Sequence, residues 1–231
     1  MSIFAVADLH LPFGAGKPMD IFKGWENYTQ KLETNWKTLV KPEDTVVIAG
    51  DVSWALKLEE TFKDFEFLER LPGKKIIIKG NHDFWWSTVT KIENYLKENN
   101  FKSIEILLNS AKKIGNICIC GTRGWLYRAS EEFDKKILAR EVGRLRFSLE
   151  YDEKLGGEPI VFMHYPPVYG NDESTDIINL LLEKKVKKCY YGHIHGNSAK
   201  SKILNGEYKG IDFRLVSCDY INFCPILVRT C

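Results

Sequence analysis

The chain has 231 residues, of which 33 are basic and 31 acidic, so its formal net charge is only +2 at pH 7. This balance argues against a nucleic-acid-binding protein, and no apolar run approaches the roughly 18 residues that span a bilayer. The length suffices for one domain with its own core, and we predict a single domain over residues 1–231. The six cysteines include no C-x-x-C pair, which indicates free thiols and a cytoplasmic location.

The first half of the chain alternates short apolar runs with stretches of helical periodicity. Strands are predicted at Ser2–Ala7, Thr45–Ala49 and Lys75–Lys79. Each segment between these strands carries apolar residues at steps of three to four, which predicts a helix. These residues are Trp25, Tyr28, Leu32, Trp36 and Leu39 in the first segment and Leu58, Phe62, Phe65 and Leu68 in the second.

The second half continues this alternation. The predicted strands are Ile104–Leu108, Asn116–Cys120, Pro159–Met163, Cys189–Tyr191, Phe213–Ser217 and Pro225–Arg229. The predicted helices contain Val89, Ile92, Tyr95 and Leu96, then Phe133, Ile137, Leu138, Val142 and Leu145, and finally Asp176–Lys188, with Ser174 or Thr175 as its cap. Alternating strands and helices are typical of an α/β sheet rather than of an all-helical or all-β fold.

All five histidines lie in or beside segments that follow short apolar runs. The segments are Asp8-Leu9-His10, Gly80-Asn81-His82-Asp83, Met163-His164-Tyr165 and Gly192-His193-Ile194-His195, and Gly50-Asp51 completes the set. Functional side chains of open α/β sheets gather beyond the carboxyl ends of the strands. The pattern therefore predicts one cluster gathered from several strand ends, with the glycines permitting tight turns.

The cluster combines carboxylate, amide and imidazole groups. Such mixed ligands suit borderline divalent ions such as Mn, Fe, Zn or Co, whereas Mg and Ca prefer oxygen alone. A carboxylate can bridge two ions, and Asp51 is the central candidate for that position. Each residue alone would also fit a structural role, such as a core histidine or a turn-capping Asp. Together they predict a centre for two metal ions.

The motifs D-x-H, G-D, G-N-H-D, a lone His after a strand and G-H-x-H, in this order, resemble those of the calcineurin-like metallophosphoesterase superfamily. The match runs from Asp8 to His195. The resemblance implies two packed mixed β-sheets flanked by helices, in the layer order α-β-β-α. Many relatives have another Asp shortly after the G-D pair, whereas Gly50-Asp51-Val52-Ser53-Trp54 has none. This departure concerns the substrate class more than metal binding.

Carried over position by position, the resemblance implies two metal sites that share Asp51. One ion would be held by Asp8, His10, Asp51 and His195, and the other by Asp51, Asn81, His164 and His193. The implied activity is hydrolysis of a phosphodiester or phosphomonoester by attack of a metal-bridging hydroxide. We expect divalent or mixed-valence ions, with Mn favoured, and a small phosphorylated substrate, with nucleotides among the candidates.

By the same resemblance, His82 would face the substrate rather than a metal. We predict that it donates a proton to the leaving oxygen, because an imidazole can hold a proton near neutral pH. Asp83 is its expected orienting partner, since a nearby carboxylate favours the charged imidazole. A helix cap is the alternative interpretation of Asp83.

Other conspicuous residues have two interpretations each. Arg123 follows a strand and would either bind a phosphate group or form a structural ion pair. Aromatic residues near the metal segments would form either a rim for a base or aryl group or part of the core. They are Trp54, Phe84, Trp85, Trp86, Trp125, Tyr165 and Tyr169. The segment Gly14–Lys17 lacks the spacing of a phosphate-binding loop. Its remaining predicted role is to border the active site. Three arginines are predicted to decorate a helix face without chemistry, namely Arg140, Arg144 and Arg146.

Three functions fit these residues. A phosphodiesterase is slightly favoured over a phosphomonoesterase, because the G-N-H-D form and the small size resemble the cyclic-nucleotide phosphodiesterase branch. A Ser/Thr protein phosphatase and a non-catalytic metal-binding scaffold of the same fold are the alternatives. The complete ligand set and the presence of His82 favour an enzyme over the scaffold.

Overall fold

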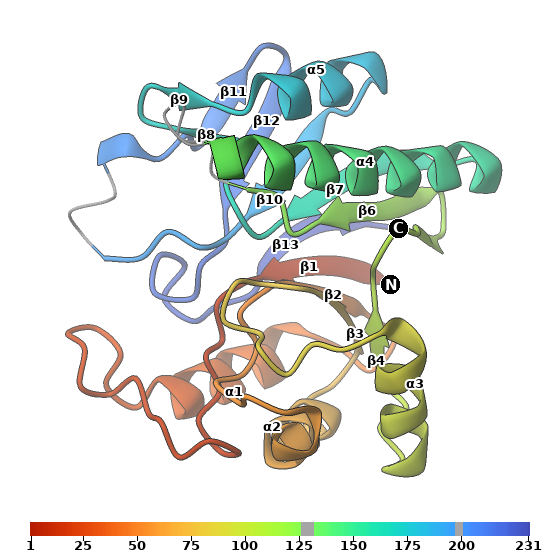
Figure 1. Cartoon of the computed structure of the whole chain (residues 1–231). Helices are drawn as coiled ribbons and strands as arrows, with labels where there is room; N and C mark the ends of the chain where they lie inside the picture. Colours follow the sequence, from red (N-terminus) through yellow and green to blue (C-terminus); the bar gives the residue numbers. More distant parts are fainter. Residues whose placement is uncertain (126–131, 197–200) are drawn as a thin grey trace.

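Two β-sheets pack face to face, and helices cover their outer faces (Figure 1). The structure is a computed structural model that describes residues 1–125, 132–196 and 201–231, apart from the side chains of residues 132 and 133. The four layers confirm the expected α-β-β-α arrangement of an α/β fold.

The first sheet is mainly parallel. In spatial order its strands are β13 (Ile226–Thr230), β1 (Ser2–Val6), β2 (Thr45–Ala49), β3 (Lys74–Ile78) and β4 (Ile104–Ile106). Only β13 runs antiparallel to its neighbour. The helices on its outer face are α1 (Tyr28–Leu39), the 3-10 helix η1 (Leu58–Thr61), α2 (Phe62–Arg70) and α3 (Val89–Glu98).

The second sheet is parallel at its centre and antiparallel at both edges. In spatial order its strands are β11 (Gly206–Tyr208), β12 (Ile211–Leu215), β10 (Lys188–Tyr191), β7 (Glu158–Met163), β6 (Ile117–Thr122) and β5 (Lys112–Ile114). Its outer face is covered by α4 (Glu132–Leu155) and α5 (Thr175–Glu183), and a short hairpin of β8 (Val168–Tyr169) and β9 (Asp172–Glu173) precedes α5. Among the described residues, no helix combines the length and the apolar character that crossing a membrane requires.

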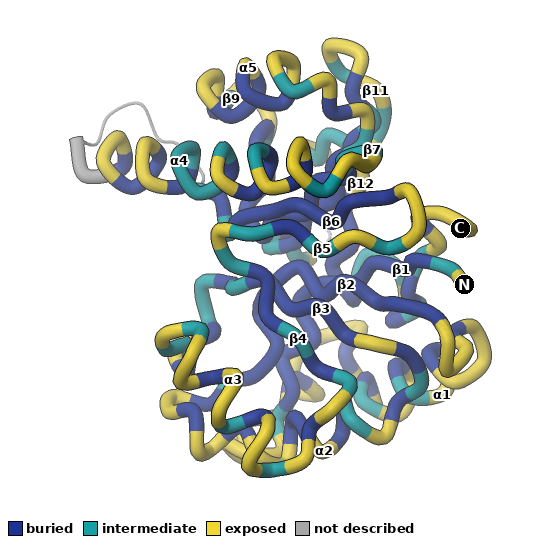
Figure 2. Tube along the Cα trace, turned by 90° about the vertical axis from the view of Figure 1, so that its right-hand side faces the viewer, coloured by how far each residue is buried: buried dark blue, intermediate teal, exposed yellow. Residues whose placement is uncertain are grey.

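Most strands are apolar on both faces, because each sheet is covered on both sides. Along β1, Phe4 and Val6 belong to the core beneath the helices, whereas Ile3 and Ala5 belong to the layer between the sheets. Figure 2 shows the strands buried between helices whose outer surfaces are exposed. The resulting rigid sandwich fixes the strand ends from which the functional loops emerge.

Several predicted boundaries differ from the structure. Helix α5 ends at Glu183 rather than Lys188, because Lys185 adopts a left-handed backbone with φ 55° and Val186 turns into the core. Ser174 occupies the N-cap position, but its hydroxyl donates to the backbone oxygen of Trp125 instead of capping the helix. The edge strands β5 and β11 have three residues each and were not predicted. The predicted helix residue Phe133 lies outside the described side chains.

Candidate metal centre

Polar side chains from five strand ends meet at one edge of the sandwich. The loops after β1, β2 and β3 of the first sheet face the loops after β7 and β10 of the second. They bring together all seven residues that were predicted to bind metal, which are Asp8, His10, Asp51, Asn81, His164, His193 and His195.

Asp8, His10 and His195 form the first group of donors. Each offers a ligand atom, and these atoms lie within 4.8 Å of one another. Nε2 of His195 is 3.3 Å from Oδ1 of Asp8. These two atoms and Nδ1 of His10 are buried and have no hydrogen-bond partner in the part of the chain that the structure describes. Because buried polar atoms are normally paired, the three open positions fit a cation bound among them.

The second group centres on the amide oxygen of Asn81. Oδ1 of Asn81 lies 2.6 Å from Nε2 of His164 and 2.8 Å from Nδ1 of His193. Oδ2 of Asp51 lies 3.5 Å from Nε2 of His164 and 3.7 Å from Nε2 of His10. Asp51 therefore lies between the two groups, which is the position that a bridging carboxylate requires.

The backbone of the site is held in an uncommon conformation. Four of the seven residues have φ in the left-handed region, namely Asp8 (60°), His10 (45°), Asp51 (53°) and His193 (72°). Such conformations cost free energy and cluster at functional sites. Glycines allow the ligands to approach: a Cβ at Gly80 would collide with Asp51, and a Cβ at Gly192 would lie 2.6 Å from Oδ2 of Asp8. The G-D, G-N and G-H pairs are therefore required by packing at the site.

Three of the four donor histidines are neutral at pH 7. Burial lowers the pKa of His10 to about 3, of His164 to about 3 and of His193 to about 4. A neutral imidazole keeps a lone pair that can bind a cation. The pKa of His195 is raised to about 10, since the charges of Asp8 and Asp219 outweigh the opposing effect of burial.

The two donor carboxylates have pKa values shifted in opposite directions. Burial, together with the charges of Asp8 and Asp83, raises the pKa of Asp51 to about 9. Burial also raises the pKa of Asp8, but nearby histidines, above all His195, outweigh it and lower that pKa overall. An adjacent cation favours an ionised carboxylate, so divalent ions would stabilise both groups in the charged form. The donor set thus fits the metal ions that its chemistry predicts.

Hydrogen bonds behind the donors fix two of the rings. Nδ1 of His164 lies 3.1 Å from the backbone oxygen of Ala49, and Nδ1 of His195 lies 2.9 Å from Oδ1 of Asp219. Partners of this kind fix the tautomer and leave the other ring nitrogen free for metal. Asp219 was not among the predicted site residues. Its position just after the predicted strand Phe213–Ser217 is the signal that could have found it.

His82 lies at the edge of the donor cluster and is half-buried. Its ring centroid lies 5.7 Å from that of His10 and 4.8 Å from that of Trp54. Its backbone N–H donates to Oδ1 of Asp51 over 2.7 Å. Burial and the charge of Lys17 lower the pKa of His82, so the ring is neutral at pH 7 in the absence of a bound anion.

The structure corrects the predicted role of Asp83. Its oxygens accept hydrogen bonds from the backbone N–H groups of Gly80 (2.7 Å), Asp51 (2.9 Å) and Val52 (2.8 Å) and from the indole of Trp85 (3.0 Å). Asp83 therefore joins the loops after β2 and β3 instead of orienting the His82 ring. The helix-cap interpretation is also wrong, because Thr88 is the N-cap of α3.

The aromatic residues divide between the site and the core. Trp54 stacks on His10 with ring centroids 4.6 Å apart, and Tyr165 lies 4.2 Å from His193. Phe84 contacts His82 and is exposed. Trp85 is buried and belongs to the core.

Lys17 and Arg123 border the site in different ways. The ammonium of Lys17 lies 3.7 Å above the Trp54 ring, so the segment Gly14–Lys17 reaches the edge of the site. Nη2 of Arg123 lies 3.5 Å from Oε1 of Glu141, so the expected structural ion pair is present. The Nε atom of Arg123 finds no hydrogen-bond partner among the described residues.

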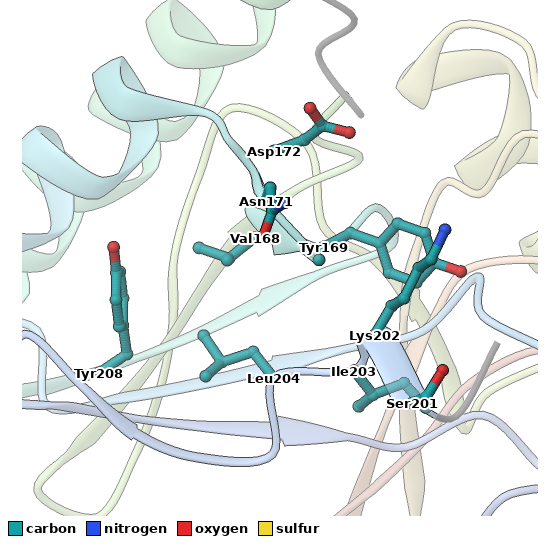
Figure 3. Close-up of a pocket in the computed structure, with 10 residues that line it drawn as sticks. Val168, Tyr169, Asn171, Asp172, Ser201, Lys202, Ile203, Leu204 and Tyr208 are labelled. Carbon is teal, nitrogen blue, oxygen red and sulfur yellow. The ribbon is translucent and has the colours of Figure 1, made fainter.

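A cavity of about 710 Å³ lies between the β8–β9 hairpin and the segment Ser201–Leu204 (Figure 3). Tyr169, Lys202 and Tyr208 are among its lining residues. None of the seven predicted metal ligands lines this cavity, so Tyr169 belongs to a different surface from the aromatic residues around His10 and His82.

The chain belongs to the calcineurin-like phosphoesterase family, whose model matches residues 1–197. Membership confirms the resemblance and identifies a metal-dependent hydrolase of phosphoester bonds. No curated protein matches the chain significantly.

Solved structures share the fold at low sequence identity. A phosphopantetheinyl hydrolase from Mycobacterium tuberculosis is 13% identical with a TM-score of 0.58, over 99% of this chain and 96% of that one. A protein of unknown function, AQ665 from Aquifex aeolicus, is 18% identical with a TM-score of 0.50, over 98% of this chain and 95% of that one. At these identities the likeness concerns the fold alone.

Proposed function

We propose that the protein is a binuclear phosphoesterase that hydrolyses a small phosphorylated substrate. The observation that carries the proposal is the pair of donor groups on either side of Asp51. One ion would be held by Asp8, His10, Asp51 and His195, and the other by Asp51, Asn81, His164 and His193. Bound ions supply a water of lowered pKa and neutralise charge on the phosphoryl oxygens. We favour manganese among the borderline ions.

His82 is the proposed proton donor to the leaving oxygen. Its ring lies beside His10 and Trp54. The hydrogen bond from the backbone N–H of His82 to Asp51 fixes the residue relative to the donor cluster. A phosphate anion in the site would offset the charge of Lys17 and raise the pKa of His82, because a nearby negative charge favours imidazolium. Trp54 and Phe84 flank the ring and would contact the leaving group.

We favour a diester over a monoester as substrate, and a small phosphoester over a phosphoprotein. The aromatic side chains of Trp54, Phe84 and Tyr165 beside the site histidines support a compact leaving group with an apolar or aromatic part. The ring of His82 beside the donor cluster favours an enzyme over a non-catalytic metal-binding scaffold, which has no need of a proton donor there.

The test uses full-length protein that is first treated with a chelator and then refilled with manganese. Hydrolysis of bis(p-nitrophenyl) phosphate and p-nitrophenyl phosphate is measured for the wild type, for Asp51→Asn, and for Glu98→Gln as a control at an exposed helix end. Metal-dependent turnover that is lost only in Asp51→Asn supports the proposal, and the ratio of the two rates ranks diester against monoester. Protein that binds manganese but hydrolyses neither ester would favour the metal-binding scaffold, and protein that binds no manganese would contradict the proposal.

A further inference from the structure

A second group of charged side chains lies beside the metal centre. Strands β3 and β6 face each other across the two sheets, since a side chain at Gly121 would collide with Ile78 of the facing strand. Lys79 and Arg123 follow these strands at the same edge as the metal donors. Together with Arg144 of α4 they line a pocket of about 270 Å³.

Positive charge is in excess in this pocket. The buried carboxylate of Glu141 serves both arginines, 2.6 Å from Nη1 of Arg144 and 3.5 Å from Nη2 of Arg123, and it also accepts the hydroxyl of Thr122. Among the described residues no carboxylate forms an ion pair with Lys79. Among the described residues, the ion pairs of the pocket thus come from Glu141 alone, and the Asp83 carboxylate acts on Lys79 only at a distance.

Two further features favour an anion in the pocket. Nε of Arg123 is buried and has no hydrogen-bond partner within residues 1–125, 132–196 and 201–231, so one donor is available there. Ser87 and Thr88 line the pocket at the N-terminus of α3, whose first turn has no acidic residue. The positive end of a helix favours a bound anion, and apolar walls such as Trp86 and Leu107 strengthen the attraction by excluding water.

The pocket adjoins the donor group around Asn81. Lys79 precedes Asn81 by two residues along the same strand end. The backbone oxygen of Arg123 accepts hydrogen bonds from the N–H groups of His164 (3.1 Å) and Tyr165 (2.8 Å). The loop of Lys79 thus continues into the loop of Asn81, and the loop of Arg123 is hydrogen-bonded to the loop of His164.

We propose that the pocket between Lys79, Arg123 and Arg144 binds a second phosphate group of the substrate, while the phosphoester to be cleaved lies at the metal centre. The inference rests on the proposed function and specifies its substrate class: a small phosphoester that carries a further phosphate. Arginine and lysine donors together with a helix N-terminus are the groups that recognise phosphate elsewhere in proteins. A substrate with one phosphate would leave the excess positive charge unpaired.

The first test measures binding without catalysis. Inorganic phosphate is titrated calorimetrically into metal-depleted, full-length protein of the wild type, Lys79→Gln and Arg144→Gln. Arg140→Gln is the matched control, because Arg140 lies exposed on the same helix as Arg144. We expect the dissociation constant to rise about tenfold in each pocket variant and to stay unchanged in the control. Lys79→Gln breaks no ion pair among the described residues, so it remains informative if Arg144→Gln unfolds.

The second test asks whether the pocket and the metal centre hold one molecule. Linear alkanediol bisphosphates of two to six carbons are compared with alkyl monophosphates of matching length as inhibitors of p-nitrophenyl phosphate hydrolysis by manganese-loaded enzyme. We expect one spacer length to inhibit at least about tenfold more tightly than its monophosphate, and this advantage to fall in Lys79→Gln and Arg144→Gln.

The outcomes separate this inference from the proposed function. A dissociation constant for phosphate that is the same in both pocket variants as in the wild type would overturn the inference, even in an active enzyme. Phosphate binding with no advantage for any bisphosphate would make the pocket a site for a free anion and overturn the substrate assignment. An equal loss for monophosphates and bisphosphates in the variants would place these cations on the cleaved phosphate instead. Absence of turnover with intact phosphate binding would reject the proposed function, and with it the substrate role, while retaining the anion site.

Discussion

Asp219 holds the ring of His195 through a hydrogen bond of 2.9 Å from Nδ1 to Oδ1. Its other oxygen accepts the backbone N–H of Gly196 over 2.9 Å, which fixes the carboxylate itself. On the far side of the ring, Nε2 points to Oδ1 of Asp8 at 3.3 Å. The ring is thus held between a supporting carboxylate and a metal-donor carboxylate.

We expect Asp219→Asn to weaken manganese binding about 10- to 100-fold, because carboxylates behind a ligating imidazole raise its basicity and fix its orientation. The variant keeps the size of the side chain but removes the charge. Manganese affinity is measured by calorimetric titration of chelated protein, with Asp176→Asn, exposed in the first turn of α5, as the control. Unchanged affinity in Asp219→Asn would show that the hydrogen bond has no part in metal binding.

His82→Ala should retain both metal ions and lose rate. The loss should reach about 10²- to 10⁴-fold for substrates with poor leaving groups, because proton donation matters most there. For p-nitrophenyl esters, whose leaving group needs little protonation, it should be smaller. Metal content and a series of aryl phosphates of graded leaving-group pKa provide the measurement. Loss of metal from this variant would mean that His82 is a ligand.

Asp83→Asn should destabilise the fold by about 2–4 kcal/mol and weaken metal binding. The Asp83 carboxylate accepts N–H groups from Gly80, Asp51 and Val52, and the NH₂ of an asparagine would oppose at least one of these donors. Urea unfolding and manganese titration are the measurements. If stability and affinity both stayed at wild-type values while the pH–rate profile changed, Asp83 would act on His82 after all.

Much of the site could be predicted from the polar residues that follow each apolar run. Short apolar runs located the central strands, and the carboxyl-end rule then placed Asp51 and Asn81 in one cluster, which the structure brings together around His164. Family motifs supplied the division of the ligands between two ions. Local sequence is sufficient here because each donor lies within four residues of the end of a buried strand.

Contacts between distant segments could not be predicted in this way. The hydrogen bonds of Asp83 to the loop after β2 depend on how two adjacent loops fold, and sequence adjacency pointed to His82 instead. Arg144 appeared to be one of several arginines on a helix face, and only the packing of α4 on β6 brings it to Arg123 and Lys79. Helix α5 ends earlier than predicted because Lys185 adopts a left-handed backbone conformation, which a lysine side chain gives no reason to expect.

Lys75 should make stability rise with pH above neutrality. It is fully buried in β3, and its ammonium donates to the backbone oxygen of Leu71 and, over 3.0 Å, to the hydroxyl of Ser103. Burial lowers its pKa from 10.5 to about 8, although the charge of Glu69 opposes this shift. Between these two values the unfolded chain holds a proton that the folded chain has released, so raising the pH stabilises the folded state.

The wild type should therefore gain about 2 kcal/mol of unfolding free energy relative to Lys75→Met between pH 8 and pH 10. Comparing the two proteins cancels the titration of the tyrosines and cysteines that both share. Urea unfolding at the two pH values measures the difference, and Lys74→Met, at the exposed neighbouring position, should show no such change. A free-energy difference between wild type and Lys75→Met that stays constant over this range would mean that Lys75 keeps its ordinary pKa despite burial.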